Sequence, residues 1–128
     1  MSDKPVLVPD AGHPITITPT EDRVVVMLGD RTVADTTNAL TLEEASYSPV
    51  QYVPLADVDP ELLVRTDHET YCPYKGDAGY YSLVVDGETH ENAVWTYESP
   101  YDAVREIAGY VAFYPNVVDV RSYPSSSR

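Results

Sequence analysis

The dipeptide Asp86-Gly87 constrains the fold of this chain more than any other local feature. It separates two strand-like runs, Gly79–Val85 and Glu88–Tyr97. Asp-Gly suits the two left-handed positions of a type I′ turn, whose twist matches that of paired strands. The pattern therefore predicts a β-hairpin. A second hairpin is predicted over residues 23–36, where two apolar runs flank a Gly-Asp dipeptide.

Shorter segments predict the remaining elements. Further strands are expected at His13–Ile17, Tyr47–Val53, Tyr110–Tyr114 and Val117–Arg121, and Ala39–Glu44 is open between strand and loop. Asp59-Pro60 predicts a helix start, since Asp caps free N–H groups and Pro suits the first helical position. Ser99-Pro100 predicts a second and better helix that ends at Gly109. Thr70–Gly79 is interpreted as a loop because of its proline and glycines.

The chain has 128 residues, a length that suits one domain. Four prolines within the first 22 residues disfavour a helix there and predict an extended N-terminal arm over 1–22. A single β-rich domain is predicted over 23–122 and a flexible tail over 123–128. The expected fold class is α+β and mainly β: one small domain of twisted antiparallel sheet with one or two short helices.

Charge excludes several classes of partner. Eight Lys and Arg stand against 21 Asp and Glu, which gives a net charge of −13. Phosphate contacts need clustered basic side chains, so neither nucleic acid nor an anionic membrane is expected as a partner. No apolar run approaches the roughly 20 residues of a membrane span, and the first residues lack a signal pattern. We therefore expect a cytoplasmic protein; the sequence does not indicate its oligomeric state.

No metal or cofactor is expected. The single cysteine, Cys72, and the widely spaced His13, His68 and His90 do not have the spacing of a zinc site. The sequence contains no phosphate-binding loop, no dinucleotide fingerprint and no nucleophile elbow. One cysteine also excludes an intramolecular disulfide.

The densest group of reactive side chains lies in Thr70–Ala78. It contains Lys75, one of only two lysines and the one that belongs to the folded body. Lys75 is a candidate contact for a phosphate or carboxylate, and if buried it is a candidate base or amine nucleophile. The alternative is a surface lysine paired with Asp77 or Glu69.

Two further residues are candidates for a role beside Lys75. Glu44 is a candidate general base, or it neutralises the lysine. Cys72 is a candidate nucleophile, although a lone cysteine is more often inert packing. We group Lys75, Glu44 and Cys72 as the candidate catalytic residues.

Tyrosine dominates the aromatic composition, with 11 Tyr against one Phe and one Trp. Tyrosine suits half-buried sheet faces and solvent-accessible pockets, although it also fills the cores of small domains. Strand alternation places Trp95 and Tyr97 on one face. The candidate ligand-binding residues are Tyr52, Thr70, Tyr74, Tyr81, Trp95 and Tyr97.

Three strings, TYCPYKGDAGYYSL, AVWTYESP and IAGYVAFYPNVVDV, resemble the domain of unknown function 427 family, which is also filed under a nucleotidyltransferase heading. The resemblance implies a β-tent-like fold, whose concave sheet can hold an aromatic-lined pocket. We expect a small-molecule pocket beside Lys75, with an anionic group of the ligand on the lysine. The alternatives are a nucleotidyltransferase, which the heading implies, and a non-enzymatic protein-interaction domain.

Overall fold

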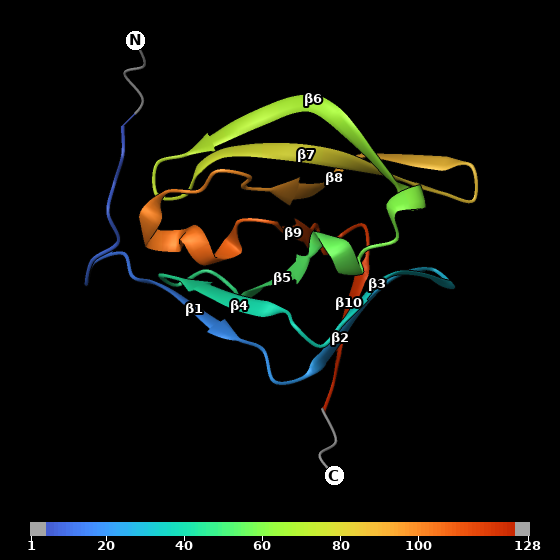
Figure 1. Ribbon diagram of the computed structural model, residues 1–128, viewed down its shortest axis with the longest axis horizontal. Helices are drawn as coiled ribbons and strands as arrows, with labels where there is room; N and C mark the ends of the chain where they lie inside the picture. The colour runs from blue at the N-terminus through green and yellow to red at the C-terminus, as the bar shows by residue number, and fades with distance from the viewer. Residues whose placement is uncertain (1–4, 125–128) are drawn as a thin grey trace.

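The computed structural model describes residues 5–124 of the chain, which form ten strands in two antiparallel sheets (Figure 1). The strands are β1 Ile15–Pro19, β2 Arg23–Leu28, β3 Arg31–Thr36, β4 Leu40–Glu44, β5 Val50–Pro54, β6 Leu63–Cys72, β7 Gly76–Val85, β8 Glu88–Thr96, β9 Tyr110–Phe113 and β10 Asp119–Tyr123. Three short 3-10 segments accompany them: η1 Leu55–Asp57, η2 Pro60–Leu62 and η3 Asp102–Ile107. The predicted mainly β single domain is confirmed, and within residues 5–124 the helical content is limited to these segments.

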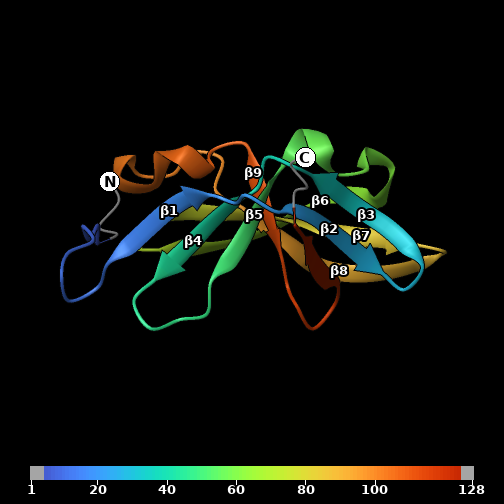
Figure 2. The ribbon, with the colours of Figure 1, turned by 90° about the horizontal axis from the view of Figure 1, so that it is seen from below.

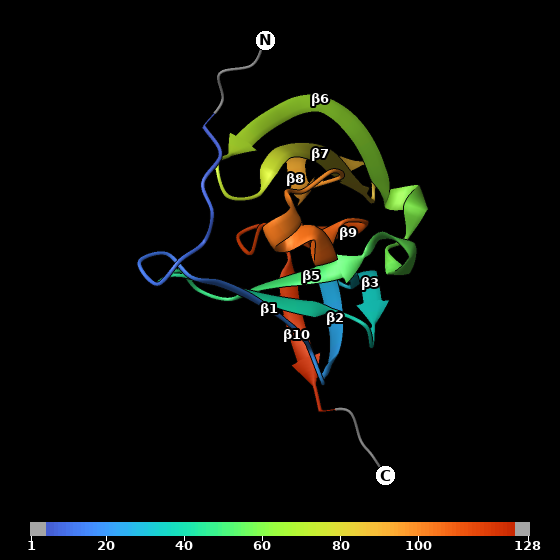
Figure 3. The same cartoon turned by 60° about the vertical axis from the view of Figure 1, so that its left-hand side comes forward.

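The larger sheet has the order β1-β4-β5-β9-β8-β7-β6, and the smaller sheet has the order β10-β2-β3. Two groups of buried side chains pack on opposite faces of the larger sheet, because alternate residues of a strand point to opposite sides. On β9, Val111 and Phe113 belong to the group that packs against β2 and β3, whereas Ala112 belongs to the group that packs against η3. In Figures 1 and 3, η3 lies between β6, β7 and β8 on one side and β1, β4 and β5 on the other.

The larger sheet is divided at its centre, where β5 and β9 pair only through Val53↔Val111 and Pro54↔Tyr110. The remaining residues of β5 pair with β4 instead, and those of β9 pair with β8. The two strands therefore diverge, and the β4–β5 and β9–β10 connections project on the same side of the molecule (Figure 2). This divergence creates the opening in which the candidate site lies.

Both predicted hairpins are confirmed. β2 and β3 pair around Gly29-Asp30, and β7 and β8 pair around Asp86-Gly87. Asp86 has φ 52° and Gly87 has φ 83°, so both central residues adopt the left-handed conformation that the dipeptide predicts.

The predicted helix after Ser99 is wrong in type and in start. The segment is a 3-10 helix that begins at Asp102, and Val104 inside it has the non-helical φ of −130°. Tyr101 occupies the cap position without a side-chain cap bond, so Ser99 does not cap it. The predicted start at Asp59 is confirmed, because its carboxylate accepts a hydrogen bond from the Glu61 N–H, but η2 spans only three residues.

The interpretation of Thr70–Gly79 as a turn-like loop is confirmed only for residues 73–75, and the rest of the segment is strand. Thr70 pairs with Ala78, and Cys72 pairs with Gly76, so the strands continue to a tight turn over residues 73–75. Gly79 lies inside the ladder, where it pairs with Glu69 on β6 and with Thr96 on β8. Gly76 has φ 109°, which only glycine adopts without strain.

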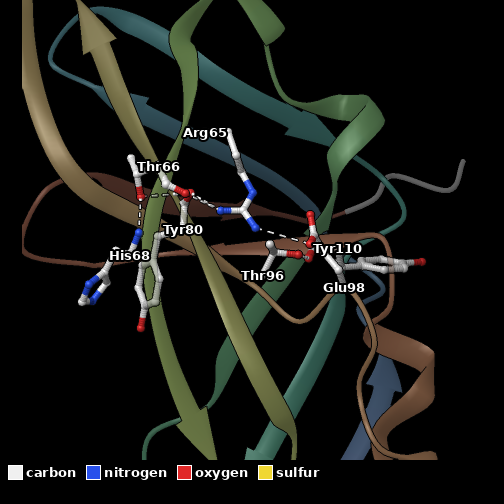
Figure 4. Close-up of polar contacts among 7 residues, drawn as sticks. All are labelled: Arg65, Thr66, His68, Tyr80, Thr96, Glu98 and Tyr110. Carbon is white, nitrogen blue, oxygen red and sulfur yellow. Dashed lines mark hydrogen bonds and ion pairs between the residues drawn. The ribbon is translucent and has the colours of Figure 1, made fainter.

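Side chains compensate for a register irregularity between Arg65 and Glu69 on β6. The Arg65 guanidinium donates to the carbonyl oxygens of Thr66 at 2.7 Å and Tyr80 at 3.2 Å, and it lies 3.4 Å from a Glu98 carboxylate oxygen (Figure 4). The Thr66 hydroxyl also donates to the Tyr80 carbonyl. These bonds satisfy polar groups that the interrupted ladder leaves open.

The boundaries expected for the arm and the tail overlap with strands. Ile15–Pro19, within the range 1–22, forms β1 and pairs with β4 at the edge of the larger sheet. Tyr123, within the range 123–128, is the last residue of β10. Residues 1–4 and 125–128 of the expected arm and tail lie outside the described residues.

Candidate functional site

A half-open cavity of about 270 Å³ lies on the η3 side of the divided sheet. We call it the Lys75 cavity. Six aromatic residues line it: Tyr47, Tyr52, Tyr80, Trp95, Tyr97 and Tyr114. The other lining residues are Leu42, Glu44, Ser48, Val50 and Lys75. The lining combines aromatic walls with one buried ion pair and several hydroxyls, as is typical of a pocket for a small organic ligand.

Lys75 is buried, with only 7% of its surface exposed. The β6–β7 turn positions it: its N–H donates to the Cys72 carbonyl, and its own carbonyl accepts from the Tyr101 N–H. Its Nζ lies 2.5 Å from Glu44 Oε1, 3.8 Å from Cys72 Sγ and 5.9 Å from the centre of the Tyr97 ring. The alternative of a surface lysine paired with Asp77 or Glu69 is therefore wrong.

Glu44 lies at the end of β4 and holds two partners. Its Oε1 accepts from Lys75, and its Oε2 lies 2.7 Å from His13 Nε2. Burial by itself would raise the pKa of Glu44, but the hydrogen bonds and charges of Lys75 and His13 outweigh that effect and lower it below its usual value. The carboxylate is thus ionised and held in place at neutral pH.

His13 reaches Glu44 from the N-terminal segment, which packs beside the β6–β7 turn. Its ring stacks on that of Tyr74, with 4.0 Å between centroids and 5° between planes. The Leu7 N–H donates to the Pro73 carbonyl, and this bond fixes the segment against the turn. No local pattern in the sequence indicates His13, because 31 residues separate it from Glu44.

The polar groups of the aromatic walls differ in whether they are already hydrogen-bonded. Trp95 Nε1 donates to the Tyr52 hydroxyl at 3.1 Å, and the two rings meet edge to face. The Tyr97 hydroxyl, in contrast, makes no hydrogen bond with any residue between 5 and 124. This hydroxyl is therefore open to a ligand.

Three tyrosines of the cavity lining have a raised pKa and stay neutral at physiological pH. Burial raises the pKa of Tyr52 and of Tyr97 well above the usual 10. Burial also raises the pKa of Tyr114 to about 12, with a further contribution from its hydrogen bond with Tyr80. These phenols act as hydrogen-bonding groups rather than as bases.

The cavity brings together Lys75, Glu44, Tyr52, Trp95 and Tyr97 of the predicted site residues. Cys72 contacts Lys75 from outside the lining. The other three candidates do not line the cavity: Thr70 bonds the hydroxyl of the lining residue Tyr80, Tyr74 stacks on His13, and Tyr81 lies under Arg65 on the opposite face.

Tyr80 and Tyr114 line the cavity but were not among the candidates. The signal for Tyr80 was available in the hairpin pattern, since Tyr80 pairs directly with Trp95 and must share its face. For Tyr114 no such signal exists, because its place depends on the divergence of β5 from β9.

Two classes of feature are missing from the described part of the chain. Among residues 5–124, no three His, Cys, Asp or Glu side chains converge in a way that could hold a metal ion. None of the helical segments in that range is long and apolar enough to cross a membrane.

Fold and site together define a small antiparallel β domain with an aromatic cavity at a split in its sheet. The chain belongs to the family described as a domain of unknown function, DUF427, whose model matches residues 16–123. The resemblance seen in the sequence is therefore confirmed. No sequence among the curated proteins matches the chain significantly.

Proposed function

We propose that this domain binds a small organic molecule in the Lys75 cavity, with an anionic group of the ligand near Lys75. The observation that carries the proposal is the buried ion pair of Lys75 and Glu44 at the edge of an aromatic cavity. Taking a lysine out of water is costly unless its charge is used or compensated. A lysine at 7% exposure that still lines a cavity supports a role in binding.

The contacts of Lys75 suggest how the ligand is held. The ammonium has three N–H groups; one donates to Glu44, and another faces the weak acceptor Cys72 Sγ. The remaining donor is available for a carboxylate or phosphate oxygen of the ligand. In this proposal the planar body of the ligand stacks on Trp95, and the free Tyr97 hydroxyl bonds a second polar group.

Glu44 acts in the proposal as a positioning residue. A carboxylate whose pKa is lowered is a weak general base at neutral pH. Its bonds to Lys75 and His13 instead fix the direction of the ammonium and cancel part of its charge. We therefore propose binding rather than a covalent role for Lys75 or Cys72.

The divided sheet also supports the β-tent-like architecture that we propose for the fold.

The nucleotidyltransferase label of the family model is not part of the proposed function. Metal-dependent nucleotidyl transfer needs two or three converging carboxylates, and residues 5–124 contain no group of three or more His, Cys, Asp or Glu that could hold a metal ion. The net charge of −13 supports our further proposal that nucleic acid is not a partner. We also propose a cytoplasmic location, with which the single cysteine is consistent.

Isothermal titration with benzoate, phenylacetate and indole-3-acetate tests the proposed function, with benzyl alcohol as the uncharged counterpart. The carboxylates are expected to bind and benzyl alcohol to bind at least tenfold more weakly, as for the loss of a charge-assisted hydrogen bond worth roughly 1.5–3 kcal/mol. Tyr97→Phe is expected to weaken binding without loss of stability, because its hydroxyl has no partner within residues 5–124.

Tyr81→Phe is the matched control, because Tyr81 lies on the opposite face of the sheet. It is expected to leave the titrations unchanged. If Tyr97→Phe and Tyr81→Phe behave alike, or if none of the three carboxylates binds, the proposed function is wrong.

A further inference from the structure

A second cavity adjoins the Lys75 cavity at the opening between β5 and β9. It has a volume of about 210 Å³, and we call it the Phe113 cavity. Three residues line both cavities: Ser48, Val50 and Trp95. The Phe113 cavity lies on the other face of the divided sheet, since Phe113 and Val53 belong to the core group that packs against β2 and β3.

The two cavities differ in chemistry. The lining of the Phe113 cavity is mostly apolar, from Val26, Pro49, Val53, Phe113, Pro115 and Val120, and none of the described residues that line it is charged. The Lys75 cavity contains an ion pair and hydroxyls. A concave surface without charge is conspicuous on a chain with a net charge of −13. Open apolar surfaces of this kind typically mark binding sites.

The opening between the strands explains why the cavities belong together. β5 and β9 pair at only two residue pairs, so the sheet does not close the space between its two faces at this point. The β4–β5 loop contributes Ser48 and Pro49, and the β9–β10 loop contributes Pro115, to this opening. Both loops project on the same side of the molecule (Figure 2).

We infer that the ligand is amphipathic, with an anionic aromatic head in the Lys75 cavity and an apolar tail in the Phe113 cavity. This inference rests on the proposed function and specifies the class of its ligand. The residues that line both cavities mark where the head of the ligand joins its tail. In this inference the head contacts Trp95 inside the Lys75 cavity, and the tail passes Val50 and extends toward Phe113. An apolar tail gains from leaving water in proportion to the surface it buries.

Isothermal titration with benzoate and its 4-ethyl, 4-butyl and 4-hexyl derivatives tests the inference. Each buried methylene is expected to tighten binding about fourfold, from a transfer free energy of about 0.8 kcal/mol. The gain is expected to stop when the tail fills the Phe113 cavity. Benzoate has the anionic aromatic head but no alkyl tail, so its binding tests the proposed function alone.

Variants at the rim of the Phe113 cavity locate the tail. Val120→Asp, at a side chain that is 39% exposed on β10, is expected to remove most of the gain from the alkyl chain and to leave benzoate binding unchanged. Pro115→Asp, in the exposed β9–β10 loop, is expected to act in the same way. Val64→Asp on β6 is the matched control, since Val64 is 50% exposed and lines neither cavity.

The outcomes separate the two proposals. If benzoate binds but the alkyl derivatives bind no more tightly, the inference is overturned and the proposed function stands. If Val120→Asp, Pro115→Asp and Val64→Asp change the alkyl series equally, the tail lies elsewhere and the inference is overturned as well. If neither benzoate nor its derivatives bind, both the inference and the proposed function are wrong.

Discussion

Lys75 and Glu44 depend on each other for their burial. Their side chains are only 9% and 13% exposed, and their atoms meet at 2.5 Å. The attraction between two buried charges mainly offsets the cost of removing them from water. Removal of one partner is therefore more harmful than removal of both, because it leaves an uncompensated charge.

Lys75→Met tests this dependence. We expect the variant to lose about 3 kcal/mol of unfolding free energy, near the lower end for a broken buried pair, because Glu44 retains His13. Urea denaturation followed by tryptophan fluorescence measures the loss. The double variant Lys75→Met/Glu44→Gln removes both charges and is expected to recover most of it. Equal stability of the single variant and the wild type would contradict the prediction.

Glu44 also makes stability depend on pH in a defined direction. Its pKa in the folded protein lies below the usual value of 4.5, so ionised Glu44 stabilises the fold above that pH. This contribution is lost as the pH falls through the lowered pKa. We expect Glu44→Gln to show a shallower loss of unfolding free energy than the wild type between about pH 5 and about pH 3. The exposed neighbour variant Glu43→Gln is expected to keep the wild-type slope, and a shallower slope there too would refute the assignment.

The β6–β7 turn is the element that places Lys75 in the cavity. Gly76 follows the lysine with φ 109°, and a Cβ there would lie 3.5 Å from the Ser99 carbonyl oxygen. A side chain strains the backbone in this conformation whatever space surrounds it. The geometry of the site therefore depends on a glycine that makes no contact with a ligand.

Gly76→Ala is expected to destabilise the protein by about 1–3 kcal/mol, the cost of a non-glycine residue in this region. Thermal unfolding measures it. Gly12→Ala is the control: Gly12 has no positive φ, and the nearest atom to its Cβ would be a carboxylate oxygen of Asp10 at 3.4 Å. A comparable loss in both variants would show that the conformation of Gly76 is not the cause.

The elements that local chemistry determines were predictable from the sequence, and the others were not. The Asp86-Gly87 hairpin follows from two adjacent residues in left-handed conformations. Leu63–Glu69 is polar and mostly exposed, so it becomes a strand only because it pairs with β7. The segment after Ser99 has a helical apolar period, yet it forms a 3-10 helix whose Val104 and Ile107 pack in the core.

At the scale of the molecule, the site depends on sheet order. β4 and the β6–β7 turn come together around η3, so Glu44 and Lys75 meet although 31 residues separate them. No pattern in the sequence encodes that order. The tyrosine composition and the isolated lysine indicated a cavity, and the pairing Tyr80↔Trp95 gave part of its wall. The lining by Tyr114 and the role of His13 required the fold.

The net charge of −13 acts on the whole molecule, because like charges repel one another more strongly in the compact state than in the unfolded chain. Salt shortens the range of this repulsion, with the screening length falling from about 14 Å at 0.05 M to about 4 Å at 0.5 M. We therefore expect the midpoint of thermal unfolding to rise over this range of NaCl. Glu91→Lys/Glu106→Lys, at two exposed positions, reduces the repulsion and is expected to raise the midpoint at low salt and to weaken its dependence on salt. An equal dependence in both proteins would show that NaCl acts through something other than the net charge.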